Sequence, residues 1–348
     1  MREARSLVPI TVGVARVLTS TCHSTRTCPA WAEVLLLVEE VSRTAGHRLG
    51  ASRAENLPVA LDRAYEQTVA WTTFSKAEVK VTEASDNMSG RSFVVTGAAG
   101  GLGSGTLEAL VARQPNAKFA LLDRDEAGLE ETAARVKSAG GTALCYPTDV
   151  TRSSDVDEAI RSAALDLGGL DGLVACAGVR MQNARIDQIS DAVWNEIFSV
   201  NVSGVFNSLR AFARVMIDSK RAGSVVAISS LSGTRGRLGQ GAYCASKAAV
   251  SHLARVAALD LAQHNVRVNV VAPGTVDTPM LAKAREQEGP EISDKRLFGD
   301  ADLLRPGIPS RRFASVDDVT NVILFLLSDQ SAHITGQVVV IDGGESVL

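Results

Sequence analysis

The chain has 348 residues, of which 45% are hydrophobic and 22% charged, and its formal net charge is −3 at pH 7. This composition is typical of a globular protein and excludes a disordered or fibrous one. A net negative charge argues against a general nucleic-acid binder, which usually carries a basic excess. No apolar run approaches the roughly 18 residues that a membrane span needs. We therefore expect neither a nucleic-acid nor a membrane partner.

The cysteines indicate a reducing compartment. Their number is odd and no C-x-x-C pair occurs, so we expect free thiols, no metal site and a cytoplasmic protein. Cys244 directly follows Tyr243, but adjacent residues of a helix point about 100° apart, so we expect this thiol to pack rather than react. The five cysteines are Cys22, Cys28, Cys145, Cys176 and Cys244.

Residues 1–87 do not follow the pattern of the rest of the chain. Residues 1–32 contain four arginines, many Ser and Thr and a single acid, Glu3, a composition that resembles a targeting peptide. Met88, in MSGRSFVVTG, looks like a natural chain start. We expect an extension over 1–87 that is a leader permitting organellar import, a poorly ordered segment, or translated sequence upstream of the true start. The folded domain is expected over 88–348.

From about residue 92 onward, strand-like apolar runs alternate with helix-length amphipathic segments. The apolar runs are unbroken, which is typical of strands that are buried on both faces. Alternation of strands and helices implies right-handed crossovers, so we predict an α/β fold with a Rossmann-type, doubly wound, parallel seven-stranded sheet. The strands are predicted over residues 92–96, 118–123, 142–146, 171–175, 224–229, 267–272 and 337–341.

The segment TGAAGGLG follows the first predicted strand and opens a helix. Its three glycines, Gly97, Gly101 and Gly103, serve a tight strand-to-helix turn, close approach of the backbone to a pyrophosphate, and close packing of helix on strand. The N–H groups and the dipole at the start of that helix favour an anion. Because strand and helix flank the turn, we interpret it as a dinucleotide-phosphate site.

Asp123 ends the second predicted strand, twenty residues after Gly103. Its carboxylate can accept hydrogen bonds from the adenosine ribose hydroxyls and would repel a 2′-phosphate, which favours NAD over NADP. Arg124 argues in the other direction, because a cation there could serve a phosphate. Asp149, after the third predicted strand, is expected to meet the adenine, to cap the helix that follows, or to do both.

Tyr243 and Lys247 stand four residues apart in AYCASKAAV, so on a helix they share one face. The alanines around them suit a helix and allow another body to approach closely. Taken alone, such a pair is usually two neighbours on a surface helix. Whether Tyr243 and Lys247 have a catalytic function therefore depends on the other motifs.

Four further motifs accompany TGAAGGLG and YCASK at 243–247: ACAG at 175–178, NVSG at 201–204, APGTVDTPM at 272–280 and DGG at 342–344. Together, the six motifs resemble those of the short-chain dehydrogenase/reductase family over residues 90–348. The resemblance implies an NAD-dependent enzyme that interconverts a secondary alcohol and a ketone, with that small molecule as its substrate. Where the family usually has NNAG, this chain has Ala175 in place of the first asparagine.

The resemblance assigns a catalytic tetrad to Asn201, Ser230, Tyr243 and Lys247, the serine lying thirteen residues before the tyrosine. Tyr243 would be the general base, with its pKa lowered from about 10 by Lys247 and by the cationic nicotinamide. Ser230 would hold the substrate oxygen, Lys247 would also bind the nicotinamide ribose, and Asn201 would hold a water that relays the proton.

The resemblance also extends the cofactor site beyond the glycine-rich turn. Thr278 is expected to meet the nicotinamide amide or the phosphates, and Tyr243 and Lys247 to lie at the nicotinamide end. The cofactor residues are expected to be Gly97, Gly101, Leu102, Gly103, Asp123, Asp149, Val150, Ala177, Gly178, Tyr243, Lys247, Pro273, Gly274, Val276 and Thr278.

The substrate side should include the charged segment 279–312, which we expect to be a long, mobile connection able to close over the ligand. Arg180, Met181, Arg237 and the run 333–335 are similar to those of 2,3-dihydro-2,3-dihydroxybenzoate dehydrogenases, whose substrate is a carboxylated cyclic diol. Arg180 or Arg237 could pair with such a carboxylate. Alternatively, both are surface or interface arginines. TPMLAKA stands where those enzymes have a tryptophan-bearing segment.

An alternative function of a different class is a catalytically silent NAD-binding sensor or scaffold with the same fold. The presence of both Tyr243 and Lys247 favours the enzyme. Residues 193–216 and 242–262 carry long apolar faces, which in the family pair across a dimer axis. Packing on the sheet explains part of each face. We expect a homodimer or homotetramer.

Overall fold

The computed structural model describes residues 90–114 and 116–347. The predicted extension over residues 1–87, with its three explanations, lies outside the described residues. Within the described part of the chain, no helix is long and apolar enough to cross a membrane.

A seven-stranded sheet forms the centre of the fold, in the order β3-β2-β1-β4-β5-β6-β9, and every pair of neighbouring strands is parallel. The predicted α/β class and all seven predicted strands are confirmed, with ends that differ by at most one residue. The strands are β1 Ser92–Thr96, β2 Lys118–Asp123, β3 Thr142–Pro147, β4 Gly172–Ala175, β5 Gly223–Ile228, β6 Val266–Pro273 and β9 Val338–Ile341.

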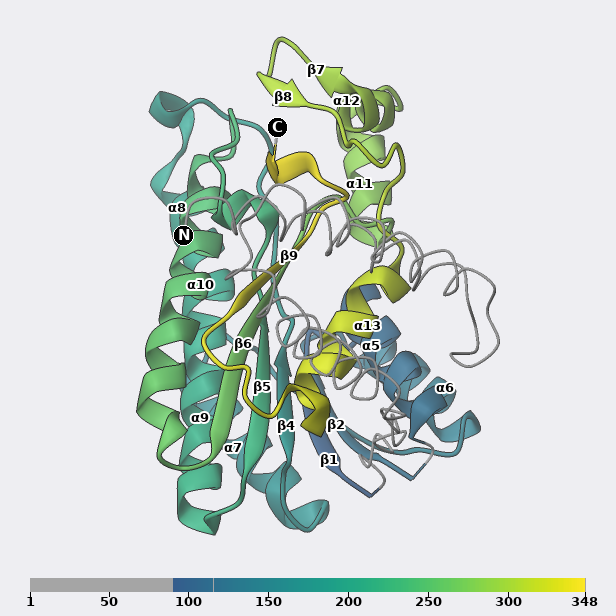
Figure 1. Ribbon diagram of the computed structural model, residues 1–348, viewed down its shortest axis with the longest axis vertical. Coiled ribbons are helices and arrows are strands. Elements are labelled where there is room, and N and C mark those ends of the chain that lie inside the picture. The colour runs from purple at the N-terminus through teal and green to yellow at the C-terminus, as the bar shows by residue number, and fades with distance from the viewer. Residues whose placement is uncertain (1–89, 115, 348) are drawn as a thin grey trace, which may run out of the picture. The chain divides into compact units, whose positions relative to one another are not determined.

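Helices cover both faces of this sheet (Figure 1), which explains why the strand sequences are apolar without alternation. Val94 points to one face and packs with α7, α9 and α10, whereas Phe93 and Val95 point to the other and pack with α5, α6 and α13. All three side chains are fully buried. These helices are α5 Gly101–Arg113, α6 Glu126–Ser138, α7 Ser153–Asp166, α9 Gly204–Ser219, α10 Gly241–Ala262 and α13 Val316–Leu327.

A short helix, α8 (Asp191–Phe198), leads through a π-helical turn, Ser199–Ser203, into α9. Such a turn inserts one extra residue into the helical path and often occurs at functional sites. Its middle residue is Asn201. The direction of this side chain therefore depends on the π-helical turn, which the helical pattern of the sequence does not indicate. Short 3₁₀ turns lie at Ile186–Gln188, Leu231–Gly233, Asp329–Ser331 and Glu345–Val347.

The charged segment that was predicted as a mobile connection is regular structure for most of its length. It folds as α11 (Pro279–Glu288), α12 (Ile292–Phe298) and a hairpin of β7 (Gly299–Asp300) and β8 (Arg305–Pro306). Pro279 stands at the first helical turn, where its fixed φ is favourable, and Leu281 and Ala284 are buried on one face. We call residues 279–306 the cap segment.

The cap segment lies at the end of the sheet from which β9 leads to the C-terminus (Figure 1). Because all strands are parallel, this is also the edge where the carboxyl ends of the strands meet. In open α/β sheets, ligands bind at that edge. The fold therefore places the cap segment over the expected ligand site.

Candidate active site

A cavity of about 710 Å³ opens at the carboxyl ends of the strands. Its wall includes residues that end or directly follow six of the seven strands of the sheet, and residues of the cap segment form another part of it. Residues from opposite ends of the domain thus share one cavity, as expected at the ligand-binding edge of a doubly wound sheet. The residues that end or follow the strands in this wall are Gly97, Asp123, Thr148, Cys176, Ile228 and Pro273.

The glycine-rich turn forms the floor of one end of the cavity. Gly97 has φ +69°, which favours glycine, and a Cβ on it would lie 2.8 Å from the backbone N of Ala177. A Cβ on Gly103 would lie 2.1 Å from the carbonyl oxygen of Gly97. Gly103 therefore lets α5 pack on β1, and it does not itself line the cavity, whereas Gly97, Gly101 and Leu102 do.

Asp123 lies in the cavity wall, where the predicted ribose partner should be. Its two carboxylate oxygens accept hydrogen bonds from the backbone N–H groups of Ala99 (3.1 Å) and Asp125 (3.2 Å). The carboxylate is thus fixed next to the glycine-rich turn. Arg124 lines the same part of the cavity.

Asp149 and Val150 also line the cavity. The carboxylate of Asp149 accepts hydrogen bonds from the backbone N–H and the hydroxyl of Thr151, at 3.0 and 2.8 Å. The backbone hydrogen bond is the main cause that lowers the pKa of Asp149. The alternative role of Asp149 as a helix cap is wrong, because the residue at the N-cap of α7 is Arg152; the carboxylate instead closes a turn before the helix.

The remaining predicted cofactor residues meet along the same wall. Thr96 was not predicted, yet its Oγ1 accepts hydrogen bonds from the backbone N–H groups of Cys176 and Ala177, at 3.2 and 3.3 Å. The threonine thereby ties the end of β1 to the ACAG segment after β4. The other predicted cofactor residues in the cavity wall are Ala177, Gly178, Tyr243, Lys247, Pro273, Gly274, Val276 and Thr278.

Lys247 is a buried cation on α10. Its Nζ donates a hydrogen bond to the carbonyl oxygen of Ile228 (2.9 Å) and lies 5.9 Å from the ring centroid of Tyr243. Burial lowers the pKa of Lys247 to about 8, because removing the ammonium from water disfavours its charged form. At neutral pH the side chain therefore keeps most of its charge next to the phenol.

Tyr243 reaches the cavity one helical turn before Lys247. Burial raises the pKa of Tyr243, and the hydrogen bond with Ser230 and the charges of Arg180 and Arg296 act in the opposite direction. The lowered pKa that we expected is thus not found in the protein alone, because the cost of burying the phenolate outweighs the positive charges around it.

Ser230 and Asn201 complete the predicted tetrad. Ser230 lines the cavity, and its Oγ accepts a hydrogen bond from the backbone N–H of Ser232 (3.2 Å). Asn201 lies just behind the wall: a Cβ on Gly178 would lie 3.3 Å from both Asn201 Oδ1 and Lys247 Nζ. The structure therefore brings Ser230, Tyr243 and Lys247 to the cavity and places Asn201 next to it.

The amide of Asn201 is already occupied. Its Oδ1 accepts from the backbone N–H of Val179 (2.8 Å), and its Nδ2 donates to the carbonyl oxygen of Val179 (3.0 Å) and to Ser246 Oγ (3.1 Å). Because both amide hydrogens are used, a relay water would meet oxygen atoms of Asn201 rather than its nitrogen.

The two arginines that were predicted to meet substrate differ in their surroundings. Both line the cavity. Arg237 Nη2 donates to a carboxylate oxygen of Glu345 (2.7 Å), and its side chain is only 13% exposed, so it is not a surface arginine. Arg180 lies close enough to Tyr243 for its charge to lower the pKa of the phenol.

Lys295, Arg296 and Arg305 of the cap segment also line the cavity. The sequence analysis missed them, because a charged segment without a motif does not indicate where its side chains point.

The part of the cavity wall around Tyr243 and the cap segment is the substrate side of the cavity. Among the described residues it has five cationic and three anionic side chains, so its net charge is positive. These side chains are Arg180, Arg237, Lys295, Arg296 and Arg305, and Glu291, Asp300 and Glu345. No group of three or more His, Cys, Asp or Glu residues in the described ranges could hold a metal ion.

Comparisons with known proteins cover the part of the chain that forms this cavity. Residues 97–346 match the family model described as enoyl-(acyl carrier protein) reductase. The chain is 33% identical over 258 residues to the 2,3-dihydro-2,3-dihydroxybenzoate dehydrogenase of Bacillus subtilis (strain 168), which covers 74% of this chain and 97% of that protein. It is 34% identical over 269 residues to the 2-(S)-hydroxypropyl-CoM dehydrogenase 3 of Xanthobacter autotrophicus, which covers 76% of this chain and 100% of that protein.

A solved structure is also similar to this chain. The crystal structure of NAD+-bound xylitol dehydrogenase superposes with a TM-score of 0.67 and 32% identity, over 74% of this chain and 100% of that one. The similarity therefore spans the whole length of that protein.

The buried ammonium of Lys247 makes stability depend on pH. Its pKa of about 8 in the folded protein lies below its ordinary value of 10.5, so between these values the unfolded chain binds more protons. The contribution of Lys247 to the unfolding free energy should therefore rise with pH from about 8 to 10.5, by about 3 kcal/mol. Burial raises the pKa of the Cys176 thiol to about 12, which acts in the opposite direction above pH 9, so the lysine contribution is the difference between wild type and Lys247→Met. Urea unfolding at several pH values measures it.

The exposed Lys137 offers a matched control, because Lys137→Met removes a lysine without removing a buried charge and should keep the wild-type pH dependence. The same pH dependence in wild type and Lys247→Met would contradict the assignment of this contribution to Lys247.

Proposed function

Because the chain belongs to the short-chain dehydrogenase/reductase family, and its relatives from Bacillus subtilis and Xanthobacter autotrophicus are named dehydrogenases, we propose that it is an NAD-dependent dehydrogenase that interconverts a secondary alcohol and a ketone. The observation that carries this proposal is that Ser230, Tyr243 and Lys247 share one cavity wall with the glycine-rich turn. A dinucleotide with its pyrophosphate at Gly97 would have its nicotinamide end at Tyr243.

The residues present fit a dinucleotide. The backbone of Gly97 and Gly101 lines the cavity at the start of α5, where helix N–H groups favour a pyrophosphate. Asp123 would hold the adenosine ribose through its fixed carboxylate. When bound, the cofactor accepts or donates the hydride; the protein supplies position and electrostatics.

In the direction of alcohol oxidation, Tyr243 Oη would take the proton of the substrate hydroxyl. Ser230 Oγ would donate a hydrogen bond to the same substrate oxygen and keep it within reach of Tyr243. The ammonium of Lys247 would stabilise the phenolate that forms when the phenol of Tyr243 is deprotonated. Burial of the phenol is unfavourable for that phenolate, so the positive charges around it are needed for Tyr243 to act as a base.

The preference for NAD rests on Asp123, whose carboxylate would lie where NADP carries a 2′-phosphate. Arg124 lies in the same part of the wall and is the residue that a phosphate would use. Turnover of the wild-type enzyme with NAD+ and with NADP+ distinguishes these two interpretations.

Tyr243→Phe tests the proposed general base. The variant keeps the ring and loses the hydroxyl, so kcat with NAD+ on a secondary alcohol should fall by about a hundredfold or more, while the affinity for NAD+ stays nearly unchanged. Absorbance at 340 nm and a binding titration measure the two quantities.

Tyr146→Phe provides the control, because Tyr146 donates its hydroxyl hydrogen to Asp166 (2.7 Å) and does not line the cavity; it should retain wild-type activity. Tight NAD binding without turnover of any alcohol in wild type would instead support the silent sensor. Equal activity in wild type and Tyr243→Phe would exclude Tyr243 as the base.

A second, narrower function is favoured by the charge of the cavity. The excess of cationic side chains on its substrate side suits an anionic substrate. The relative from Bacillus subtilis is named 2,3-dihydro-2,3-dihydroxybenzoate dehydrogenase. Oxidation of a carboxylated cyclic diol is therefore the more specific candidate. Arg180 is the candidate partner of the carboxylate, because it lines the cavity and its charge acts on Tyr243.

Arg180→Met should separate the two candidates. If Arg180 binds a substrate carboxylate, KM for a carboxylated cyclohexadiene diol should rise about tenfold or more, while KM for the same diol without the carboxylate stays unchanged. The exposed Arg161 provides the control variant, Arg161→Met. Equal rises in KM for both diols would exclude Arg180 as a carboxylate partner.

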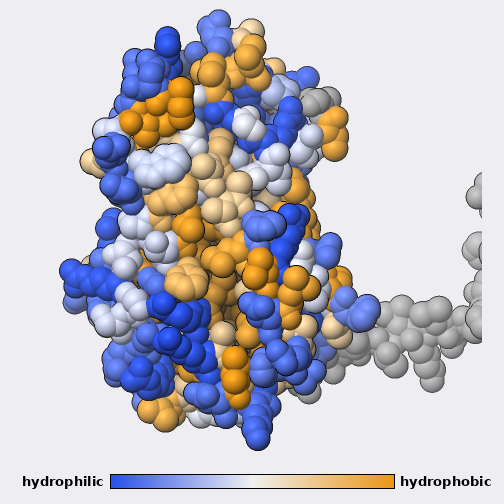
Figure 2. Space-filling model, turned by 90° about the vertical axis from the view of Figure 1, so that its left-hand side faces the viewer, coloured by the Kyte–Doolittle hydropathy of each residue, from blue (hydrophilic) through white to orange (hydrophobic). Residues whose placement is uncertain are grey.

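The proposed homodimer or homotetramer is supported by the surface of α9 and α10. Figure 2 views the side of the molecule that carries these helices and shows apolar surface along its middle, between polar flanks. Phe206 and Ile217 of α9 and Val256 and Leu259 of α10 are 40–79% exposed, which is unusual for large apolar side chains unless another surface covers them. We expect sedimentation velocity to give the mass of two or four chains; a monomer at micromolar concentration would contradict this.

A further inference from the structure

Glu345 is a buried carboxylate in the wall of the same cavity as Tyr243. It follows the DGG turn after β9 and is 0% exposed. Charged side chains are almost never buried to this extent unless they are paired. No step of the proposed reaction uses it, so its burial needs another explanation.

The turn before Glu345 is built to hold it in one place. Asp342 accepts hydrogen bonds through its two carboxylate oxygens from the backbone N–H groups of Gly344 (3.0 Å) and Ser346 (2.6 Å). Gly343 has φ +62°, and a Cβ on it would lie 2.3 Å from Ser310 Oγ. The backbone on either side of Glu345 is thus fixed.

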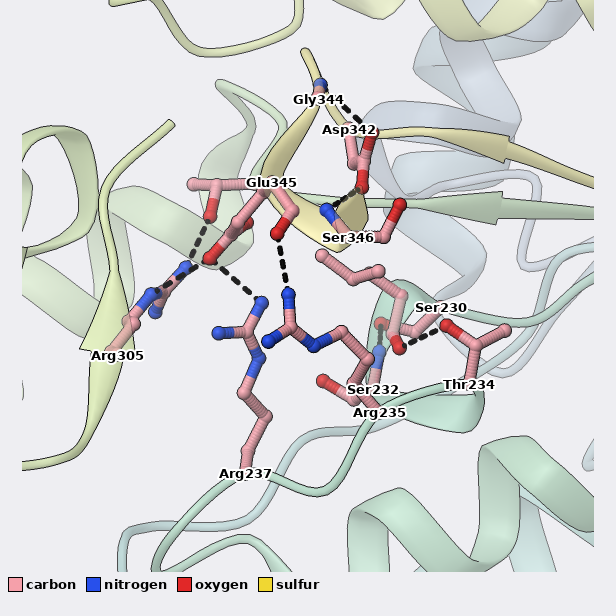
Figure 3. A network of polar contacts seen from close by, with 12 residues as sticks. Ser230, Ser232, Thr234, Arg235, Arg237, Arg305, Asp342, Gly344, Glu345 and Ser346 are labelled. Atoms are coloured by element: carbon pink, nitrogen blue, oxygen red, sulfur yellow. Dashed lines mark hydrogen bonds and ion pairs between the residues drawn. The ribbon is translucent and has the colours of Figure 1, made fainter. Parts of the chain in front are cut away.

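Two arginines from different parts of the chain share one oxygen of this carboxylate (Figure 3). Glu345 Oε1 accepts from Arg237 Nη2 (2.7 Å) and from Arg305 Nε (3.1 Å). Arg237 belongs to the loop that leads into α10, and Arg305 belongs to β8 of the cap segment. The carbonyl oxygen of Glu345 accepts from Arg235 Nη1 (2.6 Å).

Arg305 also links the cap segment to the sheet. Its Nη2 donates to Thr275 Oγ1 (3.1 Å), and Thr275 lies two residues after the end of β6. One arginine of the cap segment is therefore held both by the turn after β9 and by the loop after β6. Its side chain is only 17% exposed, and burial lowers its pKa.

From this geometry we propose that Glu345 is a positioning residue: its carboxylate fastens the cap segment, through Arg305, to the Arg237 loop, and so sets the shape of the substrate side of the cavity. This rests on the proposed function only in calling that side the substrate side. Hydrogen bonds between a guanidinium and a carboxylate are stronger than neutral ones, and they lose little to solvent here because Glu345 is buried.

The arrangement also determines which cations a substrate meets. Because Glu345 compensates part of the charge of Arg237 and Arg305, these two guanidiniums stay on the wall rather than turn to a bound anion. Removing the carboxylate would leave two arginines close together without their shared counter-charge, which is strongly unfavourable in a buried setting. The cap segment should then lose its fixed position.

Glu345→Gln tests this, because it keeps the shape of the side chain and removes its charge. Amide hydrogen exchange at residues 292–306 of the full chain should become about tenfold faster. In the same variant, KM for the alcohol should rise about tenfold, while the affinity for NAD+ changes little, since all the predicted cofactor residues lie outside residues 292–306.

Glu108→Gln is the matched control. Glu108 Oε1 accepts from Arg135 Nε at 2.7 Å, and this pair joins α5 to α6 at an exposed position away from the cavity. Glu108→Gln should leave exchange in the cap segment and KM at wild-type values.

Arg305→Met removes the other partner of the ion pair between Arg305 and Glu345. It provides a second test of the proposal if Glu345→Gln does not fold. In the double variant Glu345→Gln/Arg305→Met, amide exchange at residues 292–306 should be no faster than in the more affected single variant, because both substitutions remove the same interaction. Unchanged exchange at 292–306 in Glu345→Gln and Arg305→Met, or equally faster exchange throughout the domain, would overturn the proposal. The exchange measurement needs no turnover, so it stands even where the wild type shows no dehydrogenase activity.

Discussion

The arrangement of the site depends on one constraint, which is that all seven strands of a sheet buried on both faces run parallel. Their carboxyl ends then meet at one edge, and residues as distant in sequence as Gly97 and Glu345 line one cavity. One close contact that this requires lies between α5 and the turn after β1, where Gly103 packs on the carbonyl oxygen of Gly97. A side chain at residue 103 would push the helix away from the strand and alter the phosphate end of the site.

Much of this could be predicted from the sequence, because local patterns determine it. Each strand is an unbroken apolar run, and burial on both faces keeps that signal clear. The pair Tyr243 and Lys247 lies within one helical turn, so its geometry follows from spacing alone. The helices of the cap segment were missed for the opposite reason. Only a few of its apolar residues, such as Leu281, Ala284 and Ile292, are buried, which leaves a weak periodic signal among many charges.

Two other features could not be predicted because they depend on contacts between distant segments. The side chain of Asn201 is held by Val179 and Ser246 through a π-helical turn, and nothing in the sequence NVSG indicates this turn. The pKa of Tyr243 depends on the balance between burial and surrounding cations, one of which, Arg296, comes from the cap segment. A sequence motif identifies the base but gives no measure of that balance.

Burial acts in opposite directions on the two partners of the proposed base. It raises the pKa of Tyr243 and lowers that of Lys247, so in the protein alone each side chain is shifted towards its neutral form. A phenolate next to an ammonium would relieve both penalties together, since each charge then stabilises the other. The cations contributed by Arg180 and Arg296 act in the same direction on the phenol. The position of the cap segment, which carries Arg296, therefore affects the ease with which Tyr243 loses its proton as well as the shape of the substrate cavity.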